Sequence, residues 1–545
     1  MIAQFTTAGD GLTYDICIIG GGTVGLAIAS ALENTKLRIC VLEAGGRWQT
    51  KRSQEFYDGI VADPHVHPSL QSFRIRALGG SSRAWGGRCV PFDSIDFQKR
   101  EWVKQSGWPI TYETLLPYYR RANEVIEAGP YDYDPTSALP GSPSELVQGV
   151  DGHSFRTRLE RFSPPTNMWK RFSRLLRCSQ HIHIWLNAAV TGIRLAPNGR
   201  SVHHVDIVDL KGTKRQVTAC HYILAAGGFE TTRLLLASND VMQTGIGNAR
   251  DQLGRYYMAH LGGTVGTLRL PNAIQAIAFG YERDAAGIYC RRRLALTDEA
   301  QREHGLLNQI FRTHRPDPAD PSHNDPILSA MYLVKRTFLP KHLRGQQQNS
   351  VTLEEKFAHI QNVVSSPLRL GRFGAGWMAN RTFARRKVPS VVLEPRSNLV
   401  NLEFHSEQEP NHASRLTLTT ERDRLGMPKL RVDWKITDND LQSIARAYRL
   451  LGCKLEKIGG TISGFEPDNV VEMARKSGAM NGHHLGTTRM SASPYDGVVD
   501  AECRVHGLTN LHIAGGSVLA TSSQANPTLT ILALGLRLAE RFRYR

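Results

Sequence analysis

Apolar residues near the start of the chain follow the pattern of a strand, a tight turn, a helix and a second strand. Residues 14–19 form a short apolar run that ends in the glycine-rich residues 20–25, and Ala- and Leu-rich residues then continue to Leu32. A second apolar run, residues 37–42, ends at Glu43. Glycines that interrupt apolar runs of this length mark a turn between a strand and a helix. These residues therefore predict one βαβ unit.

Further along the chain the pattern predicts more strands and helices. Residues 190–193 and 203–209 predict two strands of a meander, and residues 221–224 predict a strand that leads through small residues into a helix at 230–238. Alternating apolar and polar residues predict antiparallel strands at 390–394, 400–404, 415–419 and 429–435. Residues 438–457 have the periodicity of an amphipathic helix. The pattern thus predicts an α/β region and a later antiparallel sheet.

Length and composition place the chain among globular proteins. The chain has 545 residues, which is long enough for two or three substructures at roughly 100–200 residues per domain. Hydrophobic residues make up 41% and charged residues 21%, which excludes a disordered or collagenous chain. The formal net charge is +17, an excess that could attract phosphates, an anionic membrane surface or an acidic partner. The charge alone does not choose among them.

The cysteines and the apolar runs bear on compartment and metal binding. The eight cysteines are scattered, with no CxxC motif and no clustering with histidines at metal-ligand spacing, so we expect reduced thiols and no metal site. The uncharged run 16–32 has no basic region before it and contains three consecutive glycines. The uncharged run 507–536 contains polar residues and a proline. We expect no targeting or membrane-spanning segment and a cytoplasmic location.

The glycines and the acid of the βαβ unit suit a dinucleotide. Gly20 permits the tight turn, Gly22 lets the backbone approach a pyrophosphate, and Gly25 lets the helix pack closely on the strand. Glu43 would accept a hydrogen bond from a ribose hydroxyl, and the helix amino terminus would face the phosphates. The alternative is a structural turn without a ligand.

The carboxyl-terminal segment carries the candidates for chemistry. It contains two adjacent histidines, His483 and His484, and later the residues Asn526 and Pro527, which suit the first positions of a helix that runs to Phe542. The amino terminus of that helix would favour a nearby anion. Histidine suits a general base because its pKa lies near neutral pH.

Several blocks in the same order resemble the glucose-methanol-choline (GMC) family of FAD-dependent alcohol oxidoreductases. They are the GGGTVG motif with Glu43, the LGGSS motif at 78–82, the segment AAGGFETTRLLLAS at 225–238, and the block from His483 to Thr530. The resemblance covers most of the chain. It implies an α/β protein with a Rossmann-like FAD-binding domain, of the GMC and p-hydroxybenzoate-hydroxylase type, and an α+β substrate domain built on an antiparallel sheet.

The resemblance also implies domain boundaries. Residues 1–95, 180–260 and 477–545 would form the FAD-binding domain, and residues 96–179 and 261–476 the substrate domain with its lid loops. Nothing in the long middle segment resembles a motif that fixes a substrate ligand. The identity of the substrate is therefore left open.

Two features are most similar to the sugar-oxidising branch of the family, which includes pyranose oxidases, glycoside 3-oxidases and fructose dehydrogenases. One is Asn526 within the sequence ANPTLT, and the other is the stretch EQEPN at 407–411 with Ser414 and Arg415. Pyranose oxidases place a histidine that binds FAD covalently just before the tryptophan of the flavin loop. Here Ala84 precedes Trp85, which implies noncovalent FAD.

The family pattern HxxG maps the catalytic base onto His483, with His484 as the second candidate. Asn526 would hydrogen-bond the substrate oxygen. Each of these side chains could instead be packed or hydrogen-bonded for structural reasons alone. The residues expected at the cofactor are Gly20, Gly22, Thr23, Val24, Gly25, Glu43, Ser81, Ser82, Arg83, Trp85, Val190, Ala226, Gly516, Ser517, Asn526, Pro527 and Thr528.

Basic residues gather in two stretches. One runs from Arg369 to Lys387 without an acidic residue, and the other contains Lys335, Arg336, Lys341 and Arg344. Such runs are usually solvated faces; the next interpretation is contact with an anionic membrane surface or with a partner such as an electron acceptor. We expect no nucleic-acid partner, since no motif of that kind is present.

Three functions remain open from the sequence. The first is FAD-dependent oxidation of an alcohol of a sugar or glycoside, with oxygen or another electron acceptor. The second is a nicotinamide-dependent dehydrogenase on the same βαβ unit, which leaves the carboxyl-terminal block unexplained. The third is a flavin-binding protein that acts on a non-sugar alcohol or without net redox chemistry. The sequence does not distinguish an oxidase from a dehydrogenase. It also does not indicate the electron acceptor or the oligomeric state.

Overall fold

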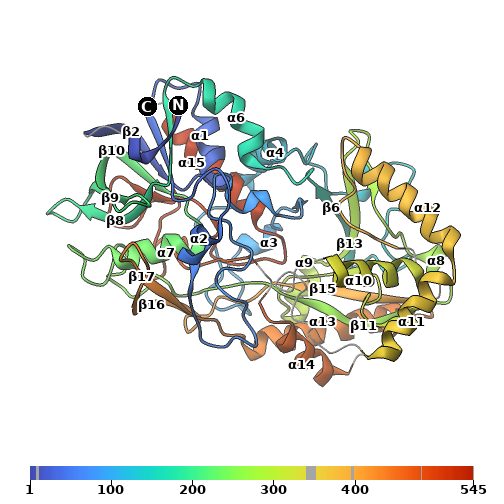
Figure 1. Ribbon diagram of the computed structural model, residues 1–545. Helices are drawn as coiled ribbons and strands as arrows, with labels where there is room; N and C mark the ends of the chain where they lie inside the picture. The colour runs from blue at the N-terminus through green and yellow to red at the C-terminus, as the bar shows by residue number, and fades with distance from the viewer. Residues whose placement is uncertain (8–10, 339–351, 394–397, 465, 480–481, 544–545) are drawn as a thin grey trace.

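A computed structural model describes residues 1–7, 11–338, 352–393, 398–464, 466–479 and 482–543. Two large β-sheets occupy opposite sides of the molecule, and both chain ends lie on the side of the first sheet (Figure 1). A third, three-stranded sheet completes the strands of the described residues. The predicted combination of an α/β part and an antiparallel part is confirmed.

The first sheet is the predicted Rossmann-like sheet, in the order β1-β7-β3-β2-β10-β9-β8 with β19 beside β10. Its strands are β1 (Ile2–Gln4), β2 (Leu12–Ile19), β3 (Ile39–Glu43), β7 (Ile182–Leu186), β8 (Ala189–Leu195), β9 (Val202–Val208), β10 (Lys214–Leu224) and β19 (Leu511–Ile513). The pairs from β1 to β10 and the β10–β19 pair are parallel, whereas β8 and β9 form an antiparallel meander. This arrangement brings the carboxyl ends of β2, β3 and β10 to one edge of the sheet.

Helix α1 (Thr23–Ala31) connects β2 to β3 and packs against the last helix, α15 (Thr528–Arg543). The close approach of α1 to the strand requires Gly25, because a Cβ atom at this position would lie 2.0 Å from the carbonyl oxygen of Gly20. Gly535 serves the contact between the two helices, where a Cβ atom would lie 2.6 Å from a methyl carbon of Val24. Glycines therefore fix how tightly both helices lie against this part of the core.

The second sheet is antiparallel, in the order β18-β11-β15-β14-β13-β6-β5 with β12 beside β13. Its strands are β5 (Arg88–Cys89), β6 (Phe155–Phe162), β11 (Leu261–Arg269), β12 (Glu282–Arg283), β13 (Tyr289–Leu296), β14 (Gln309–His314), β15 (Leu399–Ser406) and β18 (Thr461–Ser463). Helix α13 (Asp438–Glu456) begins with a capping box between Thr437 and Asp440. Its Tyr448 packs edge-on against Phe311 and Phe404, which anchors the helix on this sheet.

The third sheet joins β4 (Gly59–Val61), β17 (Pro428–Asp433) and β16 (Arg415–Arg422). The β16–β17 hairpin packs on helix α7 (Gly228–Ala237), which follows β10 of the first sheet. The sequence-based boundaries assign residues 415–433 to the substrate domain and β5 to the FAD-binding domain. In the structure this hairpin contacts α7, and β5 pairs with β6 of the second sheet.

The remaining helices connect and cover the sheets. They are α2 (Lys51–Gln54), α3 (Ser94–Phe97), α4 (Tyr112–Val125), α5 (Pro135–Ala138), α6 (Met168–Cys178), α8 (Ala273–Ala276), α9 (Asp298–His304), α10 (Pro326–Phe338), α11 (Leu353–Val364), α12 (Pro367–Trp377) and α14 (Pro467–Ser477). Short 3₁₀ turns are η1 (Phe5–Thr7), η2 (Glu55–Tyr57), η3 (Gly80–Arg83), η4 (Pro321–His323) and η7 (Gly516–Val518), and η6 (Met378–Phe383) is a π-helical turn. Among the described residues no helix is long and apolar enough to cross a membrane. All eight cysteines are free thiols.

The predicted strand at 390–394 is wrong over the described residues 390–393, which are not in a strand. Arginine side chains donate hydrogen bonds to backbone carbonyl oxygens in and next to this stretch, which strand pairing would otherwise use. Arg381 donates to the carbonyl oxygens of Val388 and Pro389, and Arg315 donates to that of Val391 over 3.3 Å. Residue 394 lies outside the described residues.

Candidate active site

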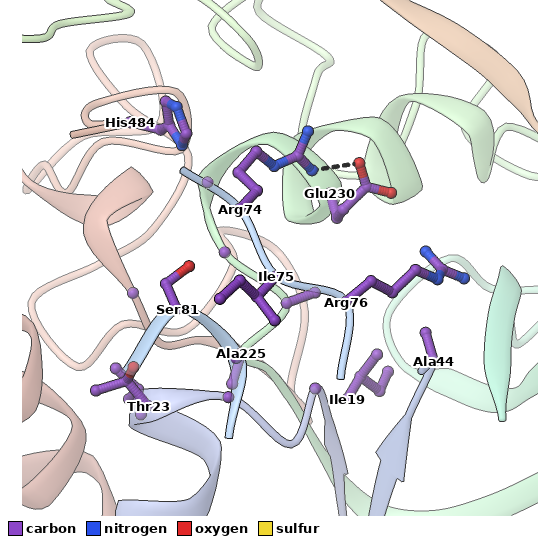
Figure 2. A pocket seen from close by; sticks show the side chains of 18 of the residues that line it. Ile19, Thr23, Ala44, Arg74, Ile75, Arg76, Ser81, Ala225, Glu230 and His484 are labelled. Carbon is purple, nitrogen blue, oxygen red and sulfur yellow. Dashed lines mark hydrogen bonds and ion pairs between the residues drawn. The ribbon is translucent and has the colours of Figure 1, made fainter. Parts of the chain in front are cut away.

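A cavity lies at the carboxyl ends of the parallel strands, where open α/β sheets bind their ligands. Ile19 at the end of β2 and Ala44 just after β3 mark one end of it in Figure 2. His484 lies at the other end of the same view, beyond Arg74. The cavity wall therefore joins the amino-terminal βαβ unit to the carboxyl-terminal block.

Glycines at the cavity surface, which lack side chains, leave room for a bound cofactor. Gly80 has a left-handed conformation with φ of 52°, and a Cβ atom there would lie 2.9 Å from the Cα atom of Gly22. Cβ atoms at Gly227 and Gly515 would meet no atom within 4 Å, so both backbones border free space. Together with the amino terminus of α1 at Thr23, this surface fits a pyrophosphate and a flat ring system.

Glu43 ties the glycine turn to the end of β3. Its Oε2 atom accepts a hydrogen bond from the Gly21 N–H over 3.0 Å, and its Oε1 atom accepts one from the Gly45 N–H over 2.7 Å. Burial raises the pKa of this carboxyl, and the two N–H donors together with Arg76 oppose that shift. The carboxylate thus has a structural role in the turn and still lines the cavity.

A chain of ion pairs closes the side of the cavity next to α7. Arg74 Nη2 lies 2.6 Å from Glu230 Oε1 on α7, as the dashed line in Figure 2 marks. Arg233 Nη2, one helical turn later, lies 2.7 Å from Asp423 Oδ2 at the tip of the β16–β17 hairpin. Burial alone would raise the pKa of Glu230, but Arg233 and Arg74 hold it below its usual value. These ion pairs attach the hairpin to the cavity wall.

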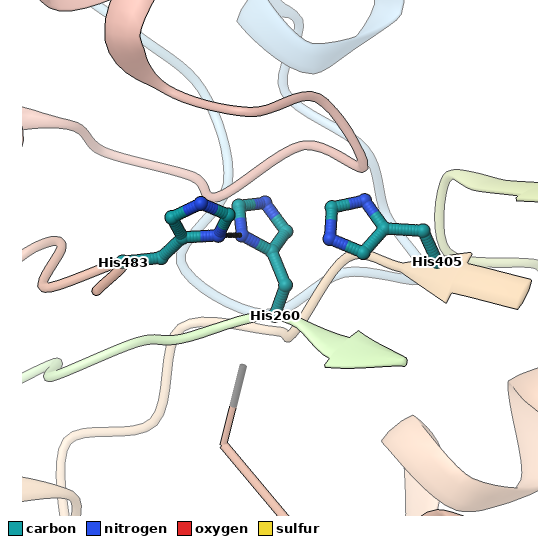
Figure 3. A group of neighbouring side chains, drawn as sticks. All are labelled: His260, His405 and His483. Atoms are coloured by element: carbon teal, nitrogen blue, oxygen red, sulfur yellow. Dashed lines mark hydrogen bonds between the residues drawn. The ribbon is translucent and has the colours of Figure 1, made fainter. Parts of the chain in front are cut away.

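Three histidines from distant parts of the sequence meet beside the cavity (Figure 3). His483 Nδ1 lies 2.7 Å from His260 Nδ1, and His483 Nε2 lies 3.2 Å from Asn526 Nδ2. His405 stacks on His260 with 4.6 Å between the ring centroids. His483 is partly exposed and lines the cavity, whereas His260 and His405 are buried.

One short segment contacts all three imidazoles. The carbonyl oxygen of Ser522 lies 3.0 Å from His260 Nε2, and the carbonyl oxygen of Gln524 accepts from His405 Nδ1. Asn526 reaches His483 from the same segment. Alternate residues of one short segment, 522, 524 and 526, therefore set the orientation of the three rings.

The pKa values of these histidines are all shifted in one direction. Burial lowers the pKa of His260 to about 4. Burial, His260 and Arg88 hold the pKa of His483 well below its usual value. Burial and the neighbouring His260 do the same for His405. At neutral pH all three rings are therefore neutral, which is the state a proton acceptor needs.

The ligand nitrogens of the three histidines lie within 4.8 Å of one another, which is close enough to raise the question of a metal. Two imidazole nitrogens bound to one zinc ion stand about 3.3 Å apart, from Zn–N distances near 2.0–2.1 Å and tetrahedral geometry. The 2.7 Å separation of the His260 and His483 Nδ1 atoms is that of a hydrogen bond. The arrangement fits a hydrogen-bonded pair better than a shared ion.

His484, the second candidate for the base, lies elsewhere on the wall. Its ring stacks on Phe229 at 3.8 Å between centroids, with an angle of 25° between the planes. Burial, Arg74 and His67 hold its pKa well below its usual value. Asn526 contacts His483 and not this ring.

Most of the residues predicted at the cofactor line the cavity. They are Gly20, Gly22, Thr23, Val24, Glu43, Ser81, Ser82, Trp85, Val190, Ala226, Gly516, Pro527 and Thr528, together with His483 and His484. The other four predicted residues are not among those that line the cavity. Gly25 packs on Gly20, Arg83 donates to the Leu78 carbonyl over 3.0 Å, Ser517 accepts from Thr488 over 2.7 Å, and Asn526 contacts His483.

Sequence reasoning missed His260, His405, Arg74 and Arg233. His260 lies 223 positions before His483, and no spacing between them indicates a contact. Arg233 was readable only as part of the helix at 230–238. The one available signal was Glu230, an acid in the first turn of a helix that follows the small residues 225–228.

Residues 410–535 match the family described as GMC oxidoreductase. The fructose dehydrogenase large subunit of Gluconobacter japonicus is 21% identical over 600 aligned residues, which cover 97% of each chain. The carboxyl-terminal part of the chain thus matches the GMC oxidoreductase family, and nearly the whole chain aligns with this dehydrogenase. The 2-methyl-1,2-propanediol dehydrogenase of Mycolicibacterium austroafricanum is 22% identical, and its alignment covers 98% of this chain and 95% of the relative.

The fold comparison agrees. The solved structure of pyridoxine 4-oxidase from Mesorbium loti matches with a TM-score of 0.54 and 16% sequence identity, covering 97% of this chain and 99% of that chain. The predicted fold class is thereby confirmed. As a GMC oxidoreductase the protein acts on CH–OH donors, and FAD is the cofactor expected of the family, which the glycine-lined cavity fits.

Proposed function

We propose that the protein oxidises an alcohol of a sugar or glycoside to a carbonyl, with His483 as the base and with noncovalently bound FAD. The observation that carries the proposal is the pairing of His483 with Asn526 at the cavity wall. The two side chains lie 3.2 Å apart, and the next residues, Pro527 and Thr528, line the cavity. His483, a neutral base with the Asn526 amide bonded to it, thus lies at the wall of the cavity where an alcohol would lie beside a bound ring system.

In this proposal His483 takes the hydroxyl proton of the substrate at its Nε2 atom. Bound FAD would supply the hydride acceptor for the alcohol carbon. The Asn526 amide orients the hydroxyl and stabilises negative charge that develops on its oxygen. The amino terminus of α15 at Thr528 favours negative charge at this end of the cavity. His484 stacks on Phe229, so in this proposal it forms part of the cavity wall and does not act as the base.

The cofactor contacts follow from the cavity lining. Glu43 accepts from a ribose hydroxyl while its oxygens hold the glycine turn, and the residues at the amino terminus of α1 face the pyrophosphate. Trp85 donates its indole N–H to the carbonyl of Thr166 and lines the cavity beside Ala84. Since no histidine precedes Trp85, FAD should be released when the protein is denatured with acid. FAD that stays in the protein precipitate would contradict the noncovalent proposal.

Support for a sugar as substrate comes from the sequence resemblance and from the name of one full-length relative, a fructose dehydrogenase. The stretch 407–411 lies behind the histidines. Glu407 pairs bidentately with Arg100 over 2.6 and 2.8 Å, and the Gln408 N–H donates to Ser522 Oγ over 2.9 Å. This stretch therefore supports the segment that holds the histidines, and it does not itself select a substrate.

The test is an anaerobic titration of the yellow protein with monosaccharides, glycosides, simple alcohols and diols, following the visible absorption band. We expect bleaching by sugars or glycosides at concentrations that leave simple alcohols without effect. Bleaching by a simple alcohol or diol alone would replace the sugar by another CH–OH donor. A protein that no alcohol bleaches would contradict the redox proposal.

A second candidate function is contact with an anionic membrane surface. Helix α11 exposes an apolar stripe at helical spacing, formed by Leu353, Phe357, Ile360 and Val364. No acidic residue occurs from Lys356 to residue 393, and Arg372, Arg385 and Lys387 are exposed there. An exposed apolar stripe followed in the chain by exposed cations is typical of segments that lie on anionic lipid.

Vesicle binding tests this surface. Replacement of Arg372, Arg385 and Lys387 by Gln should weaken binding to vesicles of anionic lipid by about 100-fold, at about fivefold per cation. Replacement of the exposed Lys36, Lys51 and Lys211 by Gln, with the same change in net charge, should leave binding unchanged. Equal loss in both variants, or dimers that bury the stripe of α11, would contradict a membrane contact. Lys341 and Arg344 of the second basic stretch lie outside the described residues. The cytoplasmic location stays a prediction.

A further inference from the structure

The hydrogen bonds of His260 determine which of its nitrogens carries the proton. A carbonyl oxygen only accepts hydrogen bonds, and the Ser522 carbonyl lies 3.0 Å from His260 Nε2. The Nε2 atom of His260 is therefore the donor. A neutral imidazole carries one proton, so His260 Nδ1 holds a lone pair and accepts. The buried position of His260 keeps the ring neutral, because its pKa is lowered to about 4.

The same reasoning passes to the next ring. His483 Nδ1 faces His260 Nδ1 at 2.7 Å, and two lone pairs cannot meet at that distance, so His483 Nδ1 carries the proton. The lone pair of neutral His483 is then at Nε2. This atom faces Asn526 Nδ2, an amide donor, at 3.2 Å, which agrees with an accepting nitrogen.

We infer that His260 is a positioning residue, which the Ser522 carbonyl holds in one tautomer and which in turn holds His483 with its Nε2 atom unprotonated, the state that takes a proton. The inference about the tautomer stands on the hydrogen bonds alone. Its consequence for catalysis rests on the proposed function of His483. The hydrogen-bonded chain from the Ser522 carbonyl through His260 to His483, here called the relay, uses a neutral imidazole as the acceptor for His483 and not a carboxylate.

A neutral acceptor changes what the base can do. A carboxylate on Nδ1 would stabilise the imidazolium and raise the pKa of His483, as opposite charges do at this distance. His260 orients the ring without adding negative charge. When Nε2 of His483 takes a proton, the Nδ1–H bond to His260 remains in place and the ring does not have to turn. His260 thus fixes the orientation of the His483 ring without raising the pKa of that ring.

His405 provides the matched comparison within the same cluster. It is buried, donates Nδ1–H to the Gln524 carbonyl of the same segment, and stacks on His260 at 4.6 Å. It makes no hydrogen bond to His483 among the described contacts, and its ring centroid lies 6.1 Å from that of His483. Loss of His405 removes packing from the cluster and leaves the relay atoms in place.

The first test is nitrogen NMR of histidine-labelled protein, which separates protonated from unprotonated ring nitrogens without any turnover. The signals of His483 are assigned by their loss in His483→Gln. At pH 7 the wild-type protein should show His483 with a protonated Nδ1 and an unprotonated Nε2. The opposite tautomer in the wild-type protein overturns the inference, whatever alcohol the protein oxidises.

Variants then connect the tautomer to the reaction. His260→Leu should release His483 into a mixture of tautomers and slow alcohol oxidation by about 10²-fold, the loss that misplacement of a reacting group causes. His260→Asn offers an amide oxygen near the position of Nδ1 and should restore the tautomer and most of the rate. His405→Leu should lower the melting temperature and keep the His483 tautomer.

The outcomes are distinguishable. A single His483 tautomer retained in His260→Leu contradicts the positioning role, and so does a mixture of tautomers in His405→Leu. If His260→Leu does not fold, the wild-type spectrum still decides. One metal ion per wild-type chain, lost in His260→Asn, would replace the relay by a metal site. The predicted tautomer in a protein that oxidises no alcohol would keep the inference and reject the proposed function.

Discussion

The Nε2 atom of His483 lies 3.2 Å from the amide nitrogen of Asn526, two residues before the first residue of the last helix. The base candidate and the start of α15 are therefore held in one unit. Asn526 belongs to the segment whose carbonyls orient His260 and His405. A change at this residue should alter the proton affinity of His483 without disturbing the sheets.

Asn526→Asp should raise the pKa of His483, because a carboxylate beside the ring favours the imidazolium. The acidic limb of the pH profile for anaerobic flavin reduction should move to higher pH by about one unit or more. Asn526→Ala removes the amide without adding charge, so it should lower the rate and leave the limb in place. Identical pH profiles for the Asp and Ala variants would argue against direct contact between residue 526 and the base.

The pH dependence of the wild-type protein follows from the lowered pKa of His483. Burial, His260 and Arg88 disfavour its protonated form, and only the neutral form accepts a proton from the substrate. The rate of flavin reduction should thus be at its full value at pH 6.5 and above. It should fall only as the pH drops well below 6.5. Stopped-flow reduction from pH 4.5 to 8 measures this, and a midpoint at or above 6.5 would be inconsistent with the buried environment.

Gly25→Ala should destabilise the FAD-binding part strongly. The added Cβ atom would lie 2.0 Å from the Gly20 carbonyl oxygen, a backbone atom that cannot move without shifting β2. We expect a lower melting temperature and loss of bound FAD. Gly452→Ala is the control, since this glycine also lies inside a helix, α13, and a Cβ atom there meets nothing within 4 Å. That substitution should stabilise the protein by about 0.5–1 kcal/mol. Equal effects at the two sites would refute the packing role of Gly25.

Arg233→Met should detach the β16–β17 hairpin from α7. It leaves the buried carboxylate of Asp423 without its partner, which costs about 3–5 kcal/mol in similar buried pairs. The melting temperature should fall and FAD should dissociate more readily, as a spectral titration would measure. Arg424→Gln on the same hairpin removes an exposed pair with Glu55, worth about 0–1 kcal/mol. If both variants keep FAD equally well, the hairpin does not close the cofactor site.

The sequence predicted the parts of the site whose residues are close together in the chain. The turn of Gly20, Gly22 and Gly25 carries its own spacing, and tight packing permits only glycine at Gly20 and Gly25. The choice of His483 and Asn526 as catalytic candidates came from the family resemblance and not from the spacing. The fold class followed from the periodicity of the strands and from the same resemblance.

The rest of the site depends on contacts that no local pattern encodes. His260 precedes β11 and meets His483 only because the second sheet packs against the carboxyl-terminal segment. The stretch at 390–393 alternates like a strand, yet Arg315 donates to the Val391 carbonyl within it and Arg381 to the Pro389 carbonyl just before it. In the sequence, Arg233 is only one polar residue of an amphipathic helix. Its partner Asp423 lies on the β16–β17 hairpin, which reaches it only in the folded protein.

The measurement that tests the account most directly is single-turnover flavin reduction by an oxidisable alcohol, compared in the wild-type protein and His483→Ala under anaerobic conditions. Both proteins must first show the same flavin spectrum, so that the cofactor is equally bound. We expect reduction in His483→Ala to be slower by about 10²–10⁴-fold, the contribution of a positioned base. An unchanged rate in a variant that binds the flavin normally would contradict His483 as the base.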